Sequence, residues 1–217
     1  THSAARSSDT GFMGAVNSQG SYNASVSIDL PAARGSLPVP LQIVYGGNRV
    51  GAAGLGWDVP LSYIFRETTL AHRRPRRQEL ALMLGGQRIT LVRNVADTGW
   101  FASRDGAQLE VRDAANGKMV LYDGEGRTYT FSPQGAAEGS TLIDGNMLLL
   151  VEIKGSDGNL AALSYDITSP TLPGGGSGLA INLKDIVYNV NPAVANCFKN
   201  RIVLNYSAAA SEPLAMS

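Results

Sequence analysis

The clearest pattern of apolar and polar positions lies in residues 22–30. Apolar side chains alternate strictly with polar ones there, so an extended chain would carry them on one face: Tyr22, Ala24, Val26, Ile28 and Leu30. Such alternation is typical of a half-buried β-strand. After a break at residues 31–38, two further strands are predicted, over residues 39–45 and from about residue 59 to residue 65.

From residue 79 onward, short apolar runs alternate with glycine-containing turns. Four hairpins are predicted, with strands at 80–84 and 89–92, at 100–103 and 108–112, at 118–122 and 127–131, and at 147–154 and 160–165. Gly-Gly and Asp-Gly turns favour tight reversals between antiparallel strands. Further strands are predicted at 179–190 and 201–206, with no helical period between them. The chain is therefore predicted to be all-β and built of antiparallel hairpins.

This pattern divides the chain into four segments. Residues 1–20 are predicted to be an extended leader, residues 21–169 the main β region, residues 170–178 a glycine-rich loop, and residues 179–217 further strands and a tail. A sheet that stopped there would leave an open edge, which isolated proteins usually protect. We therefore expect additional strands to continue it. The first residue is not Met and no hydrophobic signal core follows it, so we expect a trimmed or cleaved fragment.

Short motifs follow one another in a defined order along these segments. A turn and a strand come first, then a glycine-tryptophan motif: Pro31, Arg34, Gly35, Pro38, Tyr45, Gly54, Gly56 and Trp57. An Asp-Gly hairpin lies at residues 123–131. A second hairpin, with an Asp-Gly-Asn turn, carries Gly158, Asn159 and Tyr165. Proline fixes φ and Gly35 permits a positive φ, so the first motif is expected to be a defined turn.

In this order the motifs resemble the N-terminal part of the SpvB, Tc toxin B component and Rhs (YD-repeat) group of bacterial toxins, over residues 20–206. The sequence departs from that group at Ala32-Ala33, where Pro-Gly is common. The resemblance implies a segment of a larger Rhs/YD-type β-shell, or cocoon, which encloses a C-terminal toxic polypeptide. Virulence proteins of this kind are secreted, and we expect the complex to be held in the cytoplasm before delivery.

The resemblance also implies partners. They are the remaining shell strands of the same toxin, in cis or as a cleaved chain, the C-terminal toxin cargo, and a Tc pore subunit or a type VI secretion spike. No nucleic acid partner is expected, because the 18 basic and 18 acidic residues balance to a net charge of zero. No apolar run reaches the roughly 18–20 residues that span a bilayer, so no membrane span is predicted.

Candidate chemistry is sparse. His2 and His72 are the only histidines and lie in segments expected to be exposed. The single Cys197 excludes an internal disulfide framework, and we expect its thiol to be buried as a small hydrophobe beside Phe198. Most carboxylates occupy predicted turns, where Asp is common for backbone reasons: Asp123, Glu125, Asp144 and Asp157. We therefore predict no catalytic residues, no cofactor and no metal, and expect the chain not to be an enzyme.

Two glycine-rich or basic stretches invite other interpretations. The glycines at residues 46–54 are not expected to form a phosphate loop, because Trp57, Pro60 and a β-type segment follow them instead of a helix. Gly54 and Gly56 are expected to place Trp57 in the core. Residues 72–77 contain four arginines and are predicted to be an exposed loop. That loop lacks the interleaved aromatic residues of a nucleic-acid surface.

Three functions remain open from the sequence. A non-catalytic shell segment is the leading hypothesis, with Arg34 bound to loop carbonyls or a carboxylate. The alternative is a carbohydrate- or surface-binding β-module, similar to an adhesin, whose exposed contact residues would be Trp57, Trp100, Tyr122 and Tyr129. The third is an enzyme with an unrecognised site.

Overall fold

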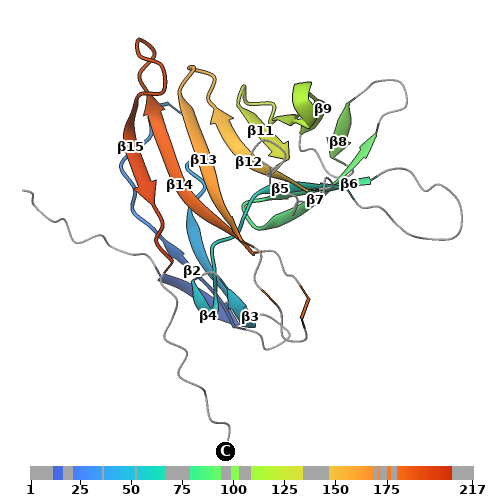
Figure 1. The fold of residues 1–217 in the computed structure, drawn as a ribbon, viewed down its shortest axis with the longest axis vertical. Helices are drawn as coiled ribbons and strands as arrows, with labels where there is room; N and C mark the ends of the chain where they lie inside the picture. The colour runs from blue at the N-terminus through green and yellow to red at the C-terminus, as the bar shows by residue number, and fades with distance from the viewer. Residues whose placement is uncertain are drawn as a thin grey trace, which may run out of the picture. The chain divides into compact units, whose positions relative to one another are not determined.

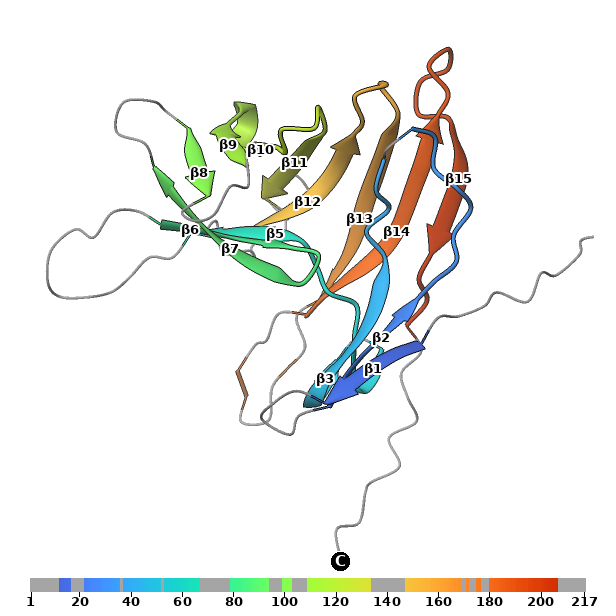
Figure 2. The ribbon, with the colours of Figure 1, turned by 180° about the vertical axis from the view of Figure 1, so that it is seen from behind.

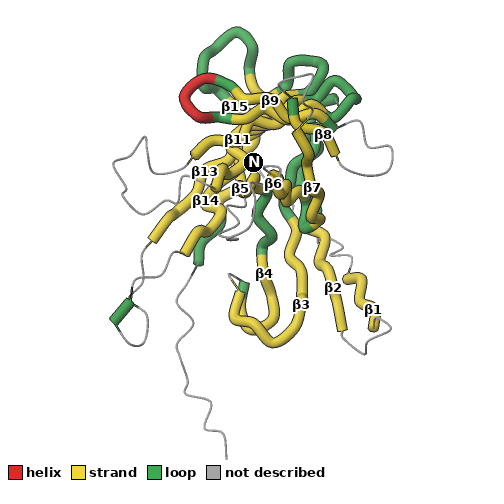
Figure 3. The backbone as a smooth tube through the Cα atoms, turned by 90° about the vertical axis from the view of Figure 1, so that its right-hand side faces the viewer, coloured by secondary structure: helices red, strands yellow, loops and turns green. Residues whose placement is uncertain are grey.

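The computed structural model confirms an all-β, antiparallel chain. It describes residues 12–16, 22–35, 37–51, 53–66, 79–93, 99–102, 109–133, 147–168, 171, 175–176 and 180–206. The regular structure of these residues consists of strands β1 to β15 and one short 3-10 turn, η1 (Ala115–Gly117), as Figures 1 and 3 show. Clustering of contacts divides the chain into two compact units. Unit 1 holds residues 1–31, 41–60 and 204–217, and unit 2 holds residues 32–40 and 61–203.

Unit 1 contains a four-stranded sheet in the order β1-β2-β3-β4. Its strands are β1 (Phe12–Val16), β2 (Tyr22–Ser27), β3 (Gln42–Gly51) and β4 (Gly54–Asp58). β1 lies within the predicted leader and pairs with β2 from Phe12↔Val26 to Val16↔Tyr22. β2 ends at Ser27, three residues before the predicted end at Leu30. β4 covers the Gly54–Trp57 motif, which the sequence suggested was a connection between strands.

Unit 2 contains an eleven-stranded antiparallel sheet. Its strands are β5 (Tyr63–Arg66), β6 (Glu79–Leu84), β7 (Gln87–Arg93), β8 (Trp100–Ala102), β9 (Glu110–Asp113), β10 (Met119–Tyr122), β11 (Thr128–Pro133), β12 (Met147–Lys154), β13 (Leu160–Thr168), β14 (Ala180–Val190) and β15 (Phe198–Val203). Their order is β11-β10-β9-β8-β7-β6-β5-β12-β13-β14-β15. The four predicted hairpins are present, although the 105–106 turn lies outside the described residues. The last two predicted strands correspond to β14 and β15, and β15 lies three residues earlier than expected.

An additional pairing closes eight of these strands into a ring. β12 pairs with β11 along one side, from Thr128↔Lys154 to Pro133↔Leu148. On its other side, β12 pairs first with β5, at residues 147–149, and then with β13, at residues 152–154. Strands β5 to β12 therefore form a closed sheet, from which β13, β14 and β15 continue (Figure 2).

The core of unit 2 lies inside this ring. Register partners place one set of fully buried side chains on a common face of the strands, with no exposed surface: Ile64, Leu82, Leu91, Val111, Leu121, Phe131 and Leu150. A closed sheet of eight strands has an interior that side chains just fill. Burial of this apolar surface stabilises the ring, at roughly 25 cal/mol per Å² removed from water.

Glycine turns set the local geometry of the hairpins. Gly85 and Gly86 have φ of 56° and 81° and form a two-residue connection between Leu84 and Gln87. Two successive positive φ angles are the mark of a type I′ turn, whose twist matches that of the flanking strands. The predicted Gly-Gly hairpin is thus confirmed in detail.

Candidate functional site

Motif residues that are distant in the sequence converge on a buried polar cluster in unit 2. The cluster, called the asparagine node here, consists of the side chains of Asn159, Asn189 and Asn200 and of the turn residues 32–35. Asn159 and Asn189 are only 3% and 4% exposed. Buried amides are costly unless they are hydrogen-bonded, so their partners determine what the cluster does.

Asn189 forms the centre of the node. Its Oδ1 accepts hydrogen bonds from the Arg34 backbone N–H at 2.8 Å and from Asn159 Nδ2 at 3.0 Å. Its Nδ2 donates to the Ala32 carbonyl at 3.1 Å and to Asn200 Oδ1 at 2.7 Å. The two lone pairs and two N–H groups of the amide are therefore all used. Asn189 also has a φ of 62°, a left-handed conformation that Asn tolerates better than most residues.

Asn159 connects the node to the hairpin between β12 and β13. Its Nδ2 donates to the Arg34 carbonyl at 3.0 Å, and its Oδ1 accepts from the Val190 N–H at 3.2 Å. Its main chain closes the hairpin, because the Gly155 N–H donates to the Asn159 carbonyl at 2.8 Å. Gly158, at φ 78°, supplies the left-handed residue that such a short loop requires.

Arg34 and Gly35 fit against this surface for different reasons. Arg34 Nη2 donates to the carbonyl of Val190, the last residue of β14. Gly35 has a φ of 65°, and a Cβ added there would overlap the Asp157 carboxylate and lie 2.8 Å from its Cγ. Asp157 is itself held by a hydrogen bond from the Asn159 N–H at 3.0 Å. A side chain at position 35 is therefore disfavoured both by backbone strain and by lack of space.

The remaining motif residues lie outside the node. Tyr165, on β13, donates from its hydroxyl to the Leu150 carbonyl at 2.5 Å, and burial raises the pKa of this phenol. Pro31 is exposed at the end of unit 1, and Pro38 is half-buried in unit 2. We therefore assign a packing role to Tyr165 and Pro38, and assign to Pro31 a role in the direction of the chain.

The glycine-tryptophan motif belongs to unit 1. Trp57 on β4 is the register partner of Tyr45 on β3, and their rings meet edge to face, 5.3 Å apart at 64°. Such aromatic pairs add about 0.5–1.5 kcal/mol beyond the area they bury. Trp57 is half-buried, which corrects its expected place in the core. Gly56, which precedes Trp57, has a φ of 80°, a left-handed conformation that glycine adopts readily.

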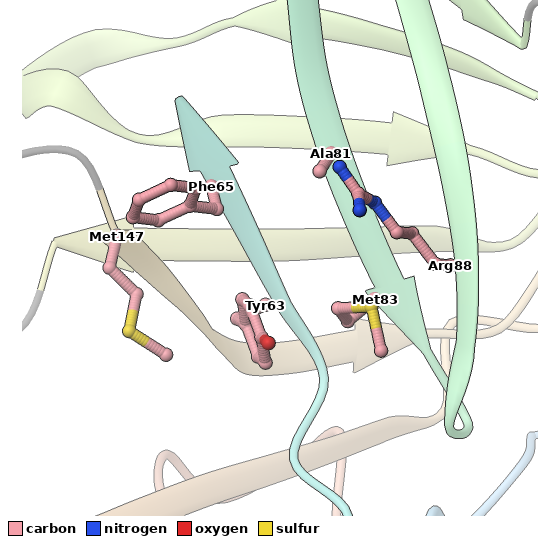
Figure 4. Close-up of a pocket in the computed structure, with 6 residues that line it drawn as sticks. All are labelled: Tyr63, Phe65, Ala81, Met83, Arg88 and Met147. Carbon is pink, nitrogen blue, oxygen red and sulfur yellow. The ribbon is translucent and has the colours of Figure 1, made fainter. Parts of the chain in front are cut away.

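A groove lies on the face of the ring opposite to its core. The groove has a volume of about 360 Å³. Its lining side chains come from β5, β6, β7 and β12 and are drawn in Figure 4: Tyr63, Phe65, Ala81, Met83, Arg88 and Met147. The lining is mostly apolar, with Arg88 exposed at one side. Aromatic rings and flexible thioethers suit irregular apolar contacts. Among the described residues that line the groove, Arg88 is the only charged one.

The turn between β10 and β11 holds a compact charge cluster. The Asp123 carboxylate accepts from the backbone N–H groups of Glu125 and Arg127 at 2.9 and 3.1 Å and from Arg127 Nε at 2.5 Å. Arg127 also pairs with Glu125. Burial acts to raise the pKa of Asp123, but these hydrogen bonds and the Arg127 charge together outweigh it and hold the pKa below its ordinary value. The carboxylates expected in turns at positions 123, 125 and 157 are there.

Two expectations about individual side chains are wrong. Cys197 is exposed, because the whole connection from Asn191 to Cys197 lies at the surface. Trp100 and Tyr129 are only 4% and 7% exposed, since both lie among the inward-facing residues of the ring. They are therefore not available as the exposed contact residues of a carbohydrate-binding module. Of the aromatic residues named for that role, Tyr122 is 42% exposed.

The described part of the chain contains no candidate metal site. Within it, no group of three His, Cys, Asp or Glu side chains could hold a metal ion. His2, His72, Asp144 and the basic stretch 72–77 lie outside the described residues. Among the described residues, no helix is both long and apolar enough to cross a membrane. The node can fix and orient chain segments, but it contains no group that changes its protonation near neutral pH.

This chain is similar to known proteins in its fold, and not detectably in its sequence. No protein-family model matches the sequence, and no curated protein is significantly similar to it. Solved structures do share its fold. A crystal structure of TcdB2-TccC3-TEV aligns with a TM-score of 0.52 and 17% identity, over 87% of this chain and 10% of that chain.

The Photorhabdus luminescens Tc holotoxin pore aligns with a TM-score of 0.51 and 16% identity, over 82% of this chain and 10% of that chain. The present chain thus spans about a tenth of the length of the structures it matches. At this identity the likeness shows the fold alone. This chain has an all-β fold also found in Tc toxin chains, whereas the finer resemblance to SpvB stays a prediction.

Sequence reasoning found one half of the node and missed the other. Arg34, Gly35, Gly158 and Asn159 stand in recognisable turns, so they could be singled out before the structure. Asn189 is the penultimate residue of the strand β14, and no glycine or proline adjoins it. An asparagine followed by Val190-Asn191-Pro192 near a strand end was the only available signal, and it is a weak one.

Proposed function

We propose that the chain is a non-catalytic structural segment of a bacterial toxin's hollow β-shell. In this proposal the shell encapsulates a C-terminal toxic effector and helps deliver it. The chain supplies wall strands, and the chemistry belongs to the effector. The complex is secreted after being held in the cytoplasm, and it engages a Tc-type pore subunit or a type VI spike.

One observation carries the proposal. The fold aligns over 82–87% of this chain with about a tenth of two much longer Tc toxin chains. Nearly the whole chain therefore corresponds to one portion of a larger protein. A segment that serves as a portion of a wall needs strands, turns and an edge for its neighbours, and it needs no catalytic cluster of its own.

The topology of unit 2 supports the same role. One end of its sheet closes on itself through the β11–β12 pairing, and the other end is β15. Within the described residues, β15 pairs with β14 alone. An edge strand offers a row of backbone N–H and C=O groups to the next strand. In the proposed shell, further strands of the same toxin, in cis or as a cleaved chain, continue from this edge.

Containment explains how such a segment acts without chemistry. Strands joined edge to edge satisfy their backbone groups mutually and leave no gap through which a polypeptide could pass. The effector inside is then kept apart from the cell that makes it. Loss of wall strands is expected to expose the effector rather than to change a reaction rate.

The test is a deletion in the longer toxin. Removal of residues 22–66, which takes out β2 to β5, is expected to prevent shell assembly or to let the effector leak, as measured by protease digestion and particle imaging. A matched deletion of residues 1–10 serves as the control and is expected to leave the shell intact. Intact, protease-resistant shells after removal of residues 22–66 would refute the proposal.

A further inference from the structure

Residues 32–40, called the strap here, occupy an unusual place in the chain. The contacts of the strap assign it to unit 2, whereas the residues on both sides of it, 1–31 and 41–60, belong to unit 1. The strap is thus a short segment of unit 2 that lies in the sequence between two segments of unit 1. Its attachment there depends on contacts of its own rather than on the elements that flank it.

The strap is bound to the rest of unit 2 mainly through hydrogen bonds to its main-chain atoms. The Ala32 carbonyl, the Arg34 N–H and the Arg34 carbonyl are bound by side-chain amides of Asn189, Asn189 and Asn159 respectively. Hydrogen bonds to main-chain atoms do not depend on the side chains of the bound segment, so they supply affinity that is largely independent of its sequence. The two asparagines present a preformed donor and acceptor pattern, because each is fixed by further bonds within unit 2.

Side-chain contacts add selectivity to this pattern. Arg34 reaches the Val190 carbonyl, and Leu37 is 5% exposed and anchors the strap by burial. A Cβ at position 35 would force the Asp157 carboxylate, which the Asn159 N–H holds, to move. The surface therefore fits a peptide that turns at an Arg-Gly step and carries an apolar side chain two residues later.

We propose that the surface around Asn159 and Asn189 is a peptide-binding site that its own strap occupies in cis. Its partner in trans is the strap of a second copy of this chain, since that copy carries the same Arg-Gly-x-Leu sequence. The cis strap competes at a high effective concentration, so exchange between copies requires that the cis strap is weakened or displaced. The site is independent of any shell function.

The experiment uses the full chain and a fluorescent peptide with the sequence of residues 31–40. Binding is followed by fluorescence polarisation to the wild-type chain and to a variant whose strap carries Arg34→Ala and Leu37→Ala. The peptide is expected to bind the variant at least about tenfold more tightly than the wild type, because the site is no longer filled in cis. Circular dichroism and thermal unfolding confirm that both proteins are folded.

A matched peptide provides the specificity control. The same peptide with Gly35→Ala is expected to bind the variant at least about tenfold more weakly, since its methyl group meets Asp157. Equal binding of the two peptides, or equal binding to wild type and variant, overturns the proposal. If the double variant is unfolded, the single Arg34→Ala chain replaces it. It must show the same order of affinities, and a flat response there also overturns the proposal.

Discussion

At the scale of single residues, two asparagines with the same backbone geometry have opposite surroundings. Asn189 is buried, has a φ of 62° and makes four side-chain hydrogen bonds. Asn116, in η1, is exposed and has a φ of 59°. Both residues have the strain of the left-handed region, but only Asn189 is hydrogen-bonded to other segments. A comparison of the two therefore separates the stabilisation by hydrogen bonds from the destabilisation by backbone conformation.

Substitution of each asparagine tests this separation. Asn189→Ala is expected to lower the free energy of unfolding by about 2–4 kcal/mol, because it leaves the Arg34 N–H and the Ala32 carbonyl without their partner. Asn116→Ala is expected to cost about 1 kcal/mol or less. Urea unfolding of the two variants measures the difference. Equal losses would mean that the node adds nothing beyond backbone conformation.

A second residue-scale prediction concerns Gly35. Gly35→Ala is expected to destabilise the chain by about 2–3 kcal/mol, since it combines a positive φ with overlap against Asp157. Gly158→Ala is the control, because Gly158 has a φ of 78° and open space around its Cα. That variant should lose only the strain, about 1 kcal/mol. Calorimetric melting of both variants decides, and a Gly158 loss as large as that of Gly35 would contradict the steric argument.

Some residue roles could be predicted from the sequence and others could not. Arg34, Gly35 and Asn159 can be identified from the sequence, because turns have strong local residue preferences. Asn189 cannot, because all four of its side-chain hydrogen bonds are to other segments, and two of them are to residues 155 and 157 positions away. The burial expected of Cys197 failed for a related reason. The neighbouring Phe198 suggested a core position, whereas the hairpin between β14 and β15 carries the thiol on its exposed loop.

At the scale of elements, turns were predicted better than strand limits. Gly85-Gly86 and the turn at 155–159 fix their hairpins locally, so strand pairs on both sides were correct. β2 ends at Ser27 although alternation continues to Leu30, since its register with β3 runs only from Ala24↔Tyr45 to Ser27↔Gln42. Strand limits depend on the partner strand, and a pattern of apolar residues does not contain that partner.

The turn between β10 and β11 gives a pH prediction at this scale. The pKa of Asp123 lies below its ordinary value of 3.8 in the folded chain. Its ionised form therefore stabilises the fold, fully so above that value, and this contribution is lost as the pH falls through the lower folded pKa. Asp123→Asn is expected to cost about 1–2 kcal/mol at pH 6, with a smaller difference from wild type near pH 3.

Urea midpoints at several pH values measure this effect. Asp29→Asn, at an exposed carboxylate in unit 1, is the control for the loss of one negative charge. A difference for Asp123→Asn that stays constant from pH 6 to pH 3 would show that its ionisation is not coupled to folding.

At the scale of the whole molecule, the closure of the ring was beyond the reach of the sequence. Hairpins follow from neighbouring runs, but the β5–β12 pairing joins residues 63–65 to residues 147–149. The β11–β12 pairing spans an undescribed connection of residues 134–146. Such pairings are selected by the fit of many inward side chains at once. The sequence supported an antiparallel sheet, and only the structure distinguishes a closed sheet from an open one.

The ring predicts how disturbance spreads through unit 2. Leu150 lies on β12, has no exposed surface, and has register partner Phe131 on β11. Leu150→Ala is expected to cost about 2–5 kcal/mol and to speed amide exchange in β5, β11 and β12 together, because closure depends on β12. Ile202→Ala, in half-buried β15, should speed exchange in β14 and β15 alone, since that strand lies outside the closed ring.

Hydrogen exchange followed by mass spectrometry on the full chain resolves both responses. In the unsubstituted protein, the amides of β12 should exchange at least about tenfold more slowly than those of β15, because β12 has neighbours on both sides. If Leu150→Ala loosened only β12 while β5 and β11 kept their protection, the strands would open independently, and the sheet would behave as a row of hairpins. Coordinated loss around the ring would instead identify β12 as the strand on which the stability of unit 2 depends.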